Sequence, residues 1–123
     1  MTASKALSGK RILVVDDDLS TLESLKQLLK ADQHTVATAS SSDEAEELFR
    51  KQIFDLVISD YLMPATSGNE LAAKLWRQTP SQRFLLMTGY FETIVNAGVP
   101  PEAILPKPFG LCELREAIAK ALA

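Results

Sequence analysis

Acidic side chains follow two short apolar segments of this chain. Asp16, Asp17 and Asp18 come directly after Ile12–Val15, and Asp60 comes directly after Leu56–Ser59. Because parallel strands end at one edge of an open α/β sheet, we expect these carboxylates to lie close together. Carboxylates gathered in this way repel one another unless a cation or a phosphoryl group organises them. The pattern therefore indicates a site for Mg²⁺, and a carboxylate there can act as a nucleophile toward phosphorus.

A hydroxyl and an amine follow two further candidate strands. Thr88 comes after the apolar stretch 83–87, and Lys107 comes after Ile104-Leu105. Phosphoryl transfer depends mainly on positioning, a metal ion and donors to the phosphoryl oxygens, which a threonine hydroxyl and a lysine ammonium supply. Prolines 106 and 108 flank the lysine and restrict its backbone, and Pro108 is a candidate for a cis peptide bond.

The elements that position these residues alternate along the chain. Apolar runs rich in β-branched residues alternate with stretches that have apolar residues at helical spacing. Strands are predicted over 12–15, 35–38, 55–59, 83–87 and 104–105, and helices over 19–31, from 41, from 67, over 92–97 and from 111 to the C-terminus. This order predicts an α/β fold, a doubly wound five-stranded parallel sheet with helices on both faces.

Helix-start signals support this division. Ser41 with Glu44 and Ser67 with Glu70 form candidate capping boxes, and Asp18 suits the N-cap of the first helix. The fourth helix should be short or irregular, because a glycine and two prolines at 98, 100 and 101 follow it closely.

Size and composition limit the classes of function. With 123 residues and a net charge of −3, the chain suits one domain over residues 10–123, preceded by a flexible arm over 1–9. The sequence has no basic stripe of the kind that indicates a nucleic-acid partner. It also has no apolar run long enough to cross a membrane. The single cysteine, Cys112, fits a reducing, cytoplasmic location and ordinary packing on a helix. His34 is expected in a solvent-exposed loop.

Four ordered motifs make the chain resemble a known family. Together they look like the receiver domain of two-component response regulators, the CheY-like family with a flavodoxin-like fold, over about residues 10 to 122. The motifs are Val14-Val15-Asp16-Asp17, Ser59-Asp60-Tyr61-Leu62-Met63-Pro64, Met87-Thr88-Gly89 and Pro106-Lys107-Pro108-Phe109.

The resemblance implies a role for each residue near the expected site. Asp60 would be the phosphoacceptor, with Thr88 and Lys107 binding the phosphoryl oxygens. Asp17 would bind Mg²⁺ directly, Asp16 through a water molecule, and Asp60 and the backbone carbonyl of Leu62 would complete the protein ligands.

The resemblance also implies the partners. A phosphohistidine on a sensor histidine kinase or histidine phosphotransfer protein would donate the phosphoryl group. A downstream protein partner would respond to a change near the fourth and fifth strands and helices. Such a module assists its own phosphorylation and dephosphorylation but does not turn over a separate substrate.

The chain departs from the family pattern in three ways, of which the first two concern the output mechanism and not the phosphorylation, and the third is minor because Ser67 still provides an N-cap. Ile104 occupies the position, three residues before the lysine, where the family usually has an aromatic switch residue. The stretch between Thr88 and Lys107 is a few residues shorter than usual, and Ser67-Gly68 replaces the frequent Asp-Gly.

Two other functions remain open from the sequence. A binding module with an intact acidic site but an impaired switch would fit Ile104 and the short fourth helix. A phosphatase similar to the haloacid dehalogenases would use Asp16 as nucleophile and Asp18 as general acid, because Asp16-x-Asp18-x-Ser20 is close to that family's signature. The second interpretation leaves Asp60 unexplained.

Overall fold

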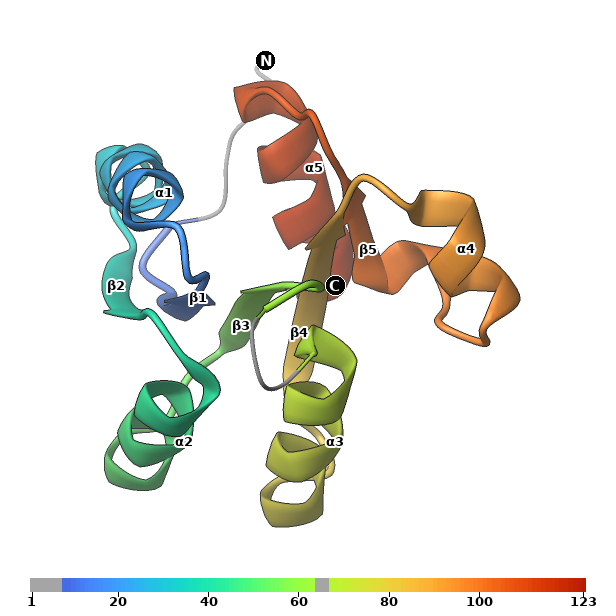
Figure 1. The fold of residues 1–123 in the computed structure, drawn as a ribbon. Coiled ribbons are helices and arrows are strands. Elements are labelled where there is room, and N and C mark those ends of the chain that lie inside the picture. The colour runs from blue at the N-terminus through green and yellow to red at the C-terminus, as the bar shows by residue number, and fades with distance from the viewer. Residues whose placement is uncertain (1–7, 64–66) are drawn as a thin grey trace.

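The computed structural model describes residues 8–63 and 67–123 and confirms the doubly wound α/β fold. Five strands alternate with five helices, and one 3-10 turn, η1, precedes the last strand (Figure 1). The elements are β1 (Arg11–Val15), α1 (Leu19–Ala31), β2 (Thr35–Ala39), α2 (Ser42–Lys51), β3 (Leu56–Asp60), α3 (Gly68–Gln78), β4 (Arg83–Thr88), α4 (Phe91–Asn96), η1 (Pro101–Ala103), β5 (Ile104–Pro106) and α5 (Leu111–Ala121).

All strand pairs are parallel, in the order β2-β1-β3-β4-β5. The register pairs Val15 with Ser59 across β1 and β3, and Asp60 with Met87 across β3 and β4. The carboxyl ends of these strands therefore meet at one edge of the sheet, as the sequence predicted.

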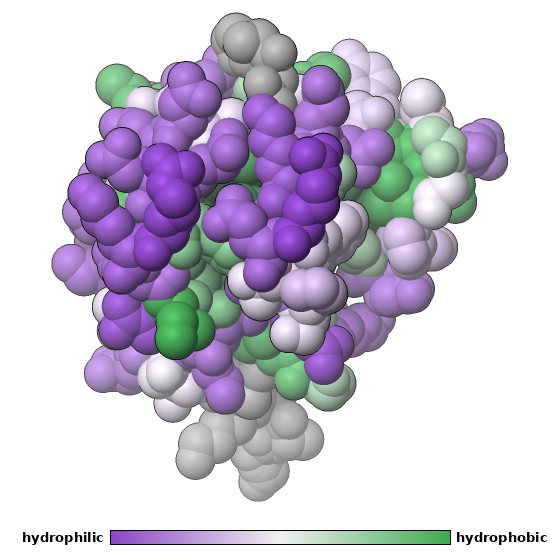
Figure 2. All heavy atoms as spheres, turned by 90° about the horizontal axis from the view of Figure 1, so that it is seen from below, coloured by the Kyte–Doolittle hydropathy of each residue, from purple (hydrophilic) through white to green (hydrophobic). Residues whose placement is uncertain are grey.

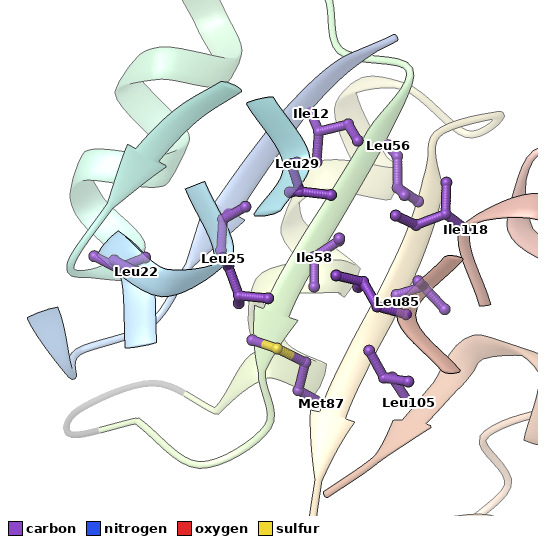
Figure 3. Packing of buried hydrophobic residues seen from close by; sticks show 12 residues of the cluster. Ile12, Leu22, Leu25, Leu29, Leu56, Ile58, Leu85, Met87, Leu105 and Ile118 are labelled. Carbon is purple, nitrogen blue, oxygen red and sulfur yellow. The ribbon is translucent and has the colours of Figure 1, made fainter. Parts of the chain in front are cut away.

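Apolar residues cover both faces of the central strands, because alternate side chains of a strand point to opposite faces. Ile12 and Val14 of β1 face α1 and α5, where they join a cluster with Leu29 and Ile118 (Figure 3). Leu13 and Val15 face α2 and α3. Full burial of such a side chain contributes about 1.5–3 kcal/mol, so these two layers supply most of the stabilisation of the sheet.

The N-terminal caps differ from prediction at one helix. Asp18 caps α1 by accepting from the backbone N–H of Ser20, and Ser67 and Glu70 form a reciprocal capping box at α3. At α2 the box is incomplete, because Glu44 accepts from the N–H and hydroxyl of Ser40 instead of the N–H of Ser41.

Other local predictions were wrong by small amounts. Strand β1 begins one residue earlier than expected, strands β2, β4 and β5 each end one residue later, β3 is shifted one residue toward the C-terminus, and α4 begins and ends one residue earlier. The expectation of an exposed His34 was wrong: the residue is only 6% exposed, and its Nδ1 accepts the Lys10 N–H at 3.2 Å. Most of the expected N-terminal arm lies in residues 1–7, outside the described part of the chain.

The face formed by α2 and α3 is mainly hydrophilic, with hydrophobic surface visible in patches between and beside these helices (Figure 2). Among the described helices, none combines the length and apolar character needed to cross a membrane.

Candidate functional site

Three carboxylates gather at the carboxyl edge of the sheet. Asp16 and Asp17 follow β1 directly and Asp60 ends β3, and an oxygen atom of each lies within 4.8 Å of the others. Asp16 is buried, Asp17 exposed and Asp60 half-buried, so the group opens to solvent on one side. The structure thus brings together three of the residues predicted from the sequence.

Asp16 carries the clearest sign of an incomplete environment. Its Oδ1 accepts the backbone N–H of Asp18 at 2.9 Å, but its buried Oδ2 has no hydrogen-bond partner among the described residues. Burial raises the pKa of the Asp16 carboxyl, the charges of Asp60 and Asp17 raise it further, and the Asp18 N–H and Lys107 oppose this. An unpaired buried carboxylate oxygen beside two other carboxylates is suited to a hard cation, so these residues fit Mg²⁺.

Lys107 provides the positive charge of the site. Its Nζ lies 3.0 Å from Oδ1 of Asp60, and its backbone N–H donates to the carbonyl of Thr88 at 2.7 Å. The Lys107–Pro108 peptide bond is cis, which agrees with the candidate named from the sequence. An ammonium so close to the central carboxylate would also be close to a phosphoryl group attached there.

Thr88 ends β4, next to the residue that pairs with Asp60. It is buried, and its Oγ1 accepts the backbone N–H of Tyr90 at 2.9 Å. A hydroxyl that accepts one hydrogen bond can still donate its own proton. Thr88 can therefore keep its bond to Tyr90 and donate to a ligand at the same time.

The start of α3 packs directly on the backbone of Asp60. The N–H of Gly68 donates to the carbonyl of Tyr61 at 2.8 Å, and a Cβ atom on Gly68 would collide with the carbonyl oxygen of Asp60. The hydroxyl of Ser59 also donates to that carbonyl, at 3.0 Å. The steric requirement at Gly68 was missed from the sequence, where the only signal was a glycine directly after an N-cap serine.

Two expected residues stand apart from this cluster. Both carboxylate oxygens of Asp18 are engaged at the start of α1, by the N–H of Ser20 and the hydroxyl of Thr21. Asp18 is therefore occupied as a cap, which leaves it poorly placed to serve as a general acid. The backbone carbonyl of Leu62 as a metal ligand stays a prediction, and Pro64 of the same motif lies outside the described residues.

Comparison with known proteins gives consistent results. The family model described as the response regulator receiver domain matches residues 12–119. The transcriptional regulatory protein ZraR of Escherichia coli is 38% identical over 91% of this chain and 26% of its own length. The sensor kinase CckA of Brucella abortus is 31% identical over 94% of this chain and 13% of its own length.

Solved structures agree with this match. The chemotaxis protein CheY4 of Vibrio cholerae is similar with a TM-score of 0.85 and 27% identity, covering 94% of this chain and 100% of that one. A CheY-like receiver domain protein of Methanospirillum hungatei gives a TM-score of 0.82 at 34% identity, with 94% of each chain covered. Neither alternative function considered from the sequence is favoured by these matches.

Proposed function

The chain belongs to the response regulator receiver family, and from this premise we propose that it accepts a phosphoryl group on Asp60 in a Mg²⁺-dependent reaction. The observation that carries the proposal is the placement of the Asp60 carboxylate, within 4.8 Å of two further carboxylates and 3.0 Å from the Lys107 ammonium. This arrangement combines a nucleophile, candidate metal ligands and a cation for the phosphoryl oxygens.

The transfer is a substitution at phosphorus. A carboxylate oxygen of Asp60 forms a bond to the phosphorus of a phosphohistidine, and the phosphorus–nitrogen bond breaks with its electron pair remaining on the imidazole nitrogen. Dephosphorylation is a hydrolysis. A water oxygen attacks the phosphorus, the bond to Asp60 breaks, and the carboxylate and inorganic phosphate are released. The chain thus assists its own phosphorylation and dephosphorylation and is not a turnover enzyme for another substrate.

Neighbouring residues hold the reacting groups. Lys107 keeps its charge beside Asp60, and the free proton of the Thr88 hydroxyl is available to a phosphoryl oxygen. Asp16, Asp17, Asp60 and the carbonyl of Leu62 would hold Mg²⁺. When bound, the ion would neutralise charge on the phosphoryl oxygens and on the three carboxylates.

The partners belong to the same proposal. The chain spans about a quarter of the length of ZraR and 13% of the length of CckA. A histidine kinase or histidine phosphotransfer protein would donate the phosphoryl group in the cytoplasm, and a separate protein or domain would receive the signal. The responding surface would lie around α4, β5 and α5, which adjoin Thr88 and Lys107.

The test is the intact mass of the protein after incubation with a small acyl phosphate, with and without Mg²⁺. We expect one phosphoryl adduct in the wild type that requires the metal and is absent in Asp60→Asn. Asp18→Asn is the matched control, because it makes the same change in a carboxylate that caps α1, and it should still form the adduct.

Two results would contradict the proposal. No adduct in the wild type under these conditions would argue against a working phosphoacceptor. An adduct that persists in Asp60→Asn would move the nucleophile elsewhere, with Asp16 as the first candidate.

A further inference from the structure

The two edges of the sheet differ in how they are protected. β5 is only three residues long and ends in Pro106, and both features discourage pairing with another strand. β2 has five residues, Thr35–Ala39, with neither a proline nor a charged side chain. In Figure 1 it forms the left-hand border of the sheet, between α1 and α2, and no other described segment lies beyond it.

The hydrogen bonds to β1 determine which groups of β2 are free. The N–H of Thr35 donates to Lys10 at 2.9 Å, and the carbonyl of Ala39 accepts from Asp16 at 3.1 Å. Because alternate residues of a parallel strand bond to the same neighbour, Ala37 also faces β1. The N–H and C=O groups of Val36 and Thr38 therefore point away from the sheet, where another strand could pair with them.

A groove of about 420 Å³ lies between Thr38, near the end of β2, and α2. Besides Thr38, it is lined by three exposed carboxylates, Asp43, Glu44 and Glu47, against one ammonium, that of Lys51. Lys51 lies 3.3 Å from Glu47, so its charge is already matched within the helix. Leu48 adds a half-buried apolar side chain. The groove is therefore negatively charged, with an apolar side chain near backbone groups that have no hydrogen-bond partner among residues 8–63 and 67–123.

We propose that the β2 edge and this groove form a docking site for an extended, basic peptide segment, which adds as a strand beside β2. Backbone pairing with Val36 and Thr38 would provide affinity, and lysine or arginine side chains over the groove would provide selectivity. Pairing of two β2 edges from separate copies is disfavoured, because it would bring the two sets of carboxylates together. The site lies outside the phosphoacceptor cluster and does not depend on Asp60.

Thr38→Pro tests the backbone part of the proposal. The substitution removes an N–H that points away from the sheet but keeps the bonds of Thr35, Ala37 and Ala39 to β1, and proline is tolerated at such edge positions. Circular dichroism and Mg²⁺-dependent phosphorylation verify that the variant is folded. A second variant, Asp43→Lys with Glu47→Lys, tests the charge without changing the strand, and Glu116→Lys on α5 is its control.

The probe is a fluorescent peptide of alternating lysine and valine, with binding measured by anisotropy at low and high salt. We expect the wild type and Asp60→Asn to bind, and Thr38→Pro to lose binding. The double charge reversal should weaken binding by at least about tenfold, and Glu116→Lys should change it by less than about twofold. Hydrogen exchange should show new protection at the amides of Val36 and Thr38.

A peptide of the same sequence with alternate backbone nitrogens methylated provides the decisive comparison, because it keeps the charge but cannot complete a ladder. Equal binding of the methylated peptide, or unchanged binding to Thr38→Pro, would overturn strand addition. Tighter binding of a glutamate–valine peptide would overturn the charge argument. A dimer in sedimentation that Thr38→Pro dissociates, with no peptide binding, would show that the edge pairs with a second copy instead.

Discussion

The junction between β3 and α3 and the junction between β4 and α4 follow neighbouring strands at the same edge of the sheet, but they are built differently. At the first, Gly68 packs on the carbonyl of Asp60, and a complete capping box starts a helix of 11 residues. At the second, α4 has six residues and no side-chain cap, and Gly98 follows it with φ +104°. A Cβ on Gly89 would have no atom of the described residues within 4 Å, apart from those of its two chain neighbours.

This difference suits the two junctions to different parts of the proposed function. The first would hold the residue that is phosphorylated, and the second would move in response. At the first junction, the start of α3 packs against the backbone of Asp60, the proposed nucleophile. The second begins at Thr88, and within α4 only Ile94 is buried. Segments with few buried contacts open at low free-energy cost, so α4 is the α-helix whose position a phosphoryl group could change most easily. Ile104, which is buried, cannot supply the aromatic movement typical of the family.

Lys107→Ala should have the largest effect of these variants on the rate of phosphorylation. It tests whether the charge beside Asp60 takes part in the transfer. The change removes the ammonium 3.0 Å from Asp60, and the loss of one preorganised donor to a reacting group typically lowers a rate by about a hundredfold or more. We expect phosphorylation by a small acyl phosphate to slow accordingly, as followed by intact mass over time.

The control for Lys107→Ala is Lys120→Ala, which removes an exposed ammonium from the last turn of α5. Its rate should match that of the wild type. If both variants phosphorylated at the wild-type rate, the charge beside Asp60 would have no part in the transfer.

Gly68→Ala and Gly89→Ala compare the two junctions directly. Overpacking of a tight contact typically costs about 1–3 kcal/mol, so Gly68→Ala should lower the free energy of unfolding by this amount and displace Asp60. Gly89→Ala adds the same methyl group to open space and should leave stability nearly unchanged. Urea unfolding of both variants measures the difference, and equal effects would remove the contrast between the junctions.

Much of the fold and the site could be predicted because their signals are local. Apolar strand runs, helix caps and the positions of Asp16, Asp60, Thr88 and Lys107 at strand ends all follow from short patterns and the geometry of a parallel sheet. The order of the elements then places these side chains on one edge without further information.

What could not be predicted depends on contacts between distant segments. The requirement for glycine at position 68 arises from the approach of α3 to the end of β3, and the hydrogen bond to the buried His34 ring comes from Lys10, 24 residues earlier. The bond of Glu44 to Ser40 in place of Ser41 depends on how the chain leaves β2. Neither composition nor spacing carries this information.

Leu62 and Tyr90 offer a smaller test that involves both junctions. Leu62 follows Asp60 by two residues and Tyr90 follows Thr88 by two, and both are more than half exposed, at 55% and 57%. We expect this bulky pair to hinder in-line attack of water on the phosphorylated aspartate. Tyr90→Ala and Leu62→Asn should therefore each speed dephosphorylation severalfold, as measured by decay of the adduct. Unchanged decay rates in both variants would show that these side chains do not control access.

The smallest loss of stability is expected at His34, which lies at the amino end of β2, away from the carboxyl ends of the strands where the site is. Burial lowers the pKa of His34 from its ordinary value of 6.5, the positive charge of Lys10 lowers it further, and the Asp32 charge opposes both. The unfolded chain therefore binds a proton more readily than the folded one just below pH 6.5. Stability from the neutral ring is complete above this pH and is lost as the pH falls toward the folded-state pKa.

Protonation of the ring at Nδ1 would also abolish the hydrogen bond from the Lys10 N–H, and a hydrogen bond of this kind contributes about 0.5–1.5 kcal/mol. Urea unfolding between pH 7.5 and pH 5.5 should show a loss of about this size. His34→Gln, which keeps an acceptor but does not titrate, should flatten the profile over the same range. The phosphorylation rate at fixed pH should be the same in both proteins, because His34 precedes β2 at the amino end of the sheet, whereas Asp60 ends β3 at its carboxyl end. A profile equally steep in His34→Gln would show that a group other than His34 causes the pH dependence, and Asp16 is excluded because its raised pKa would instead increase stability as the pH falls.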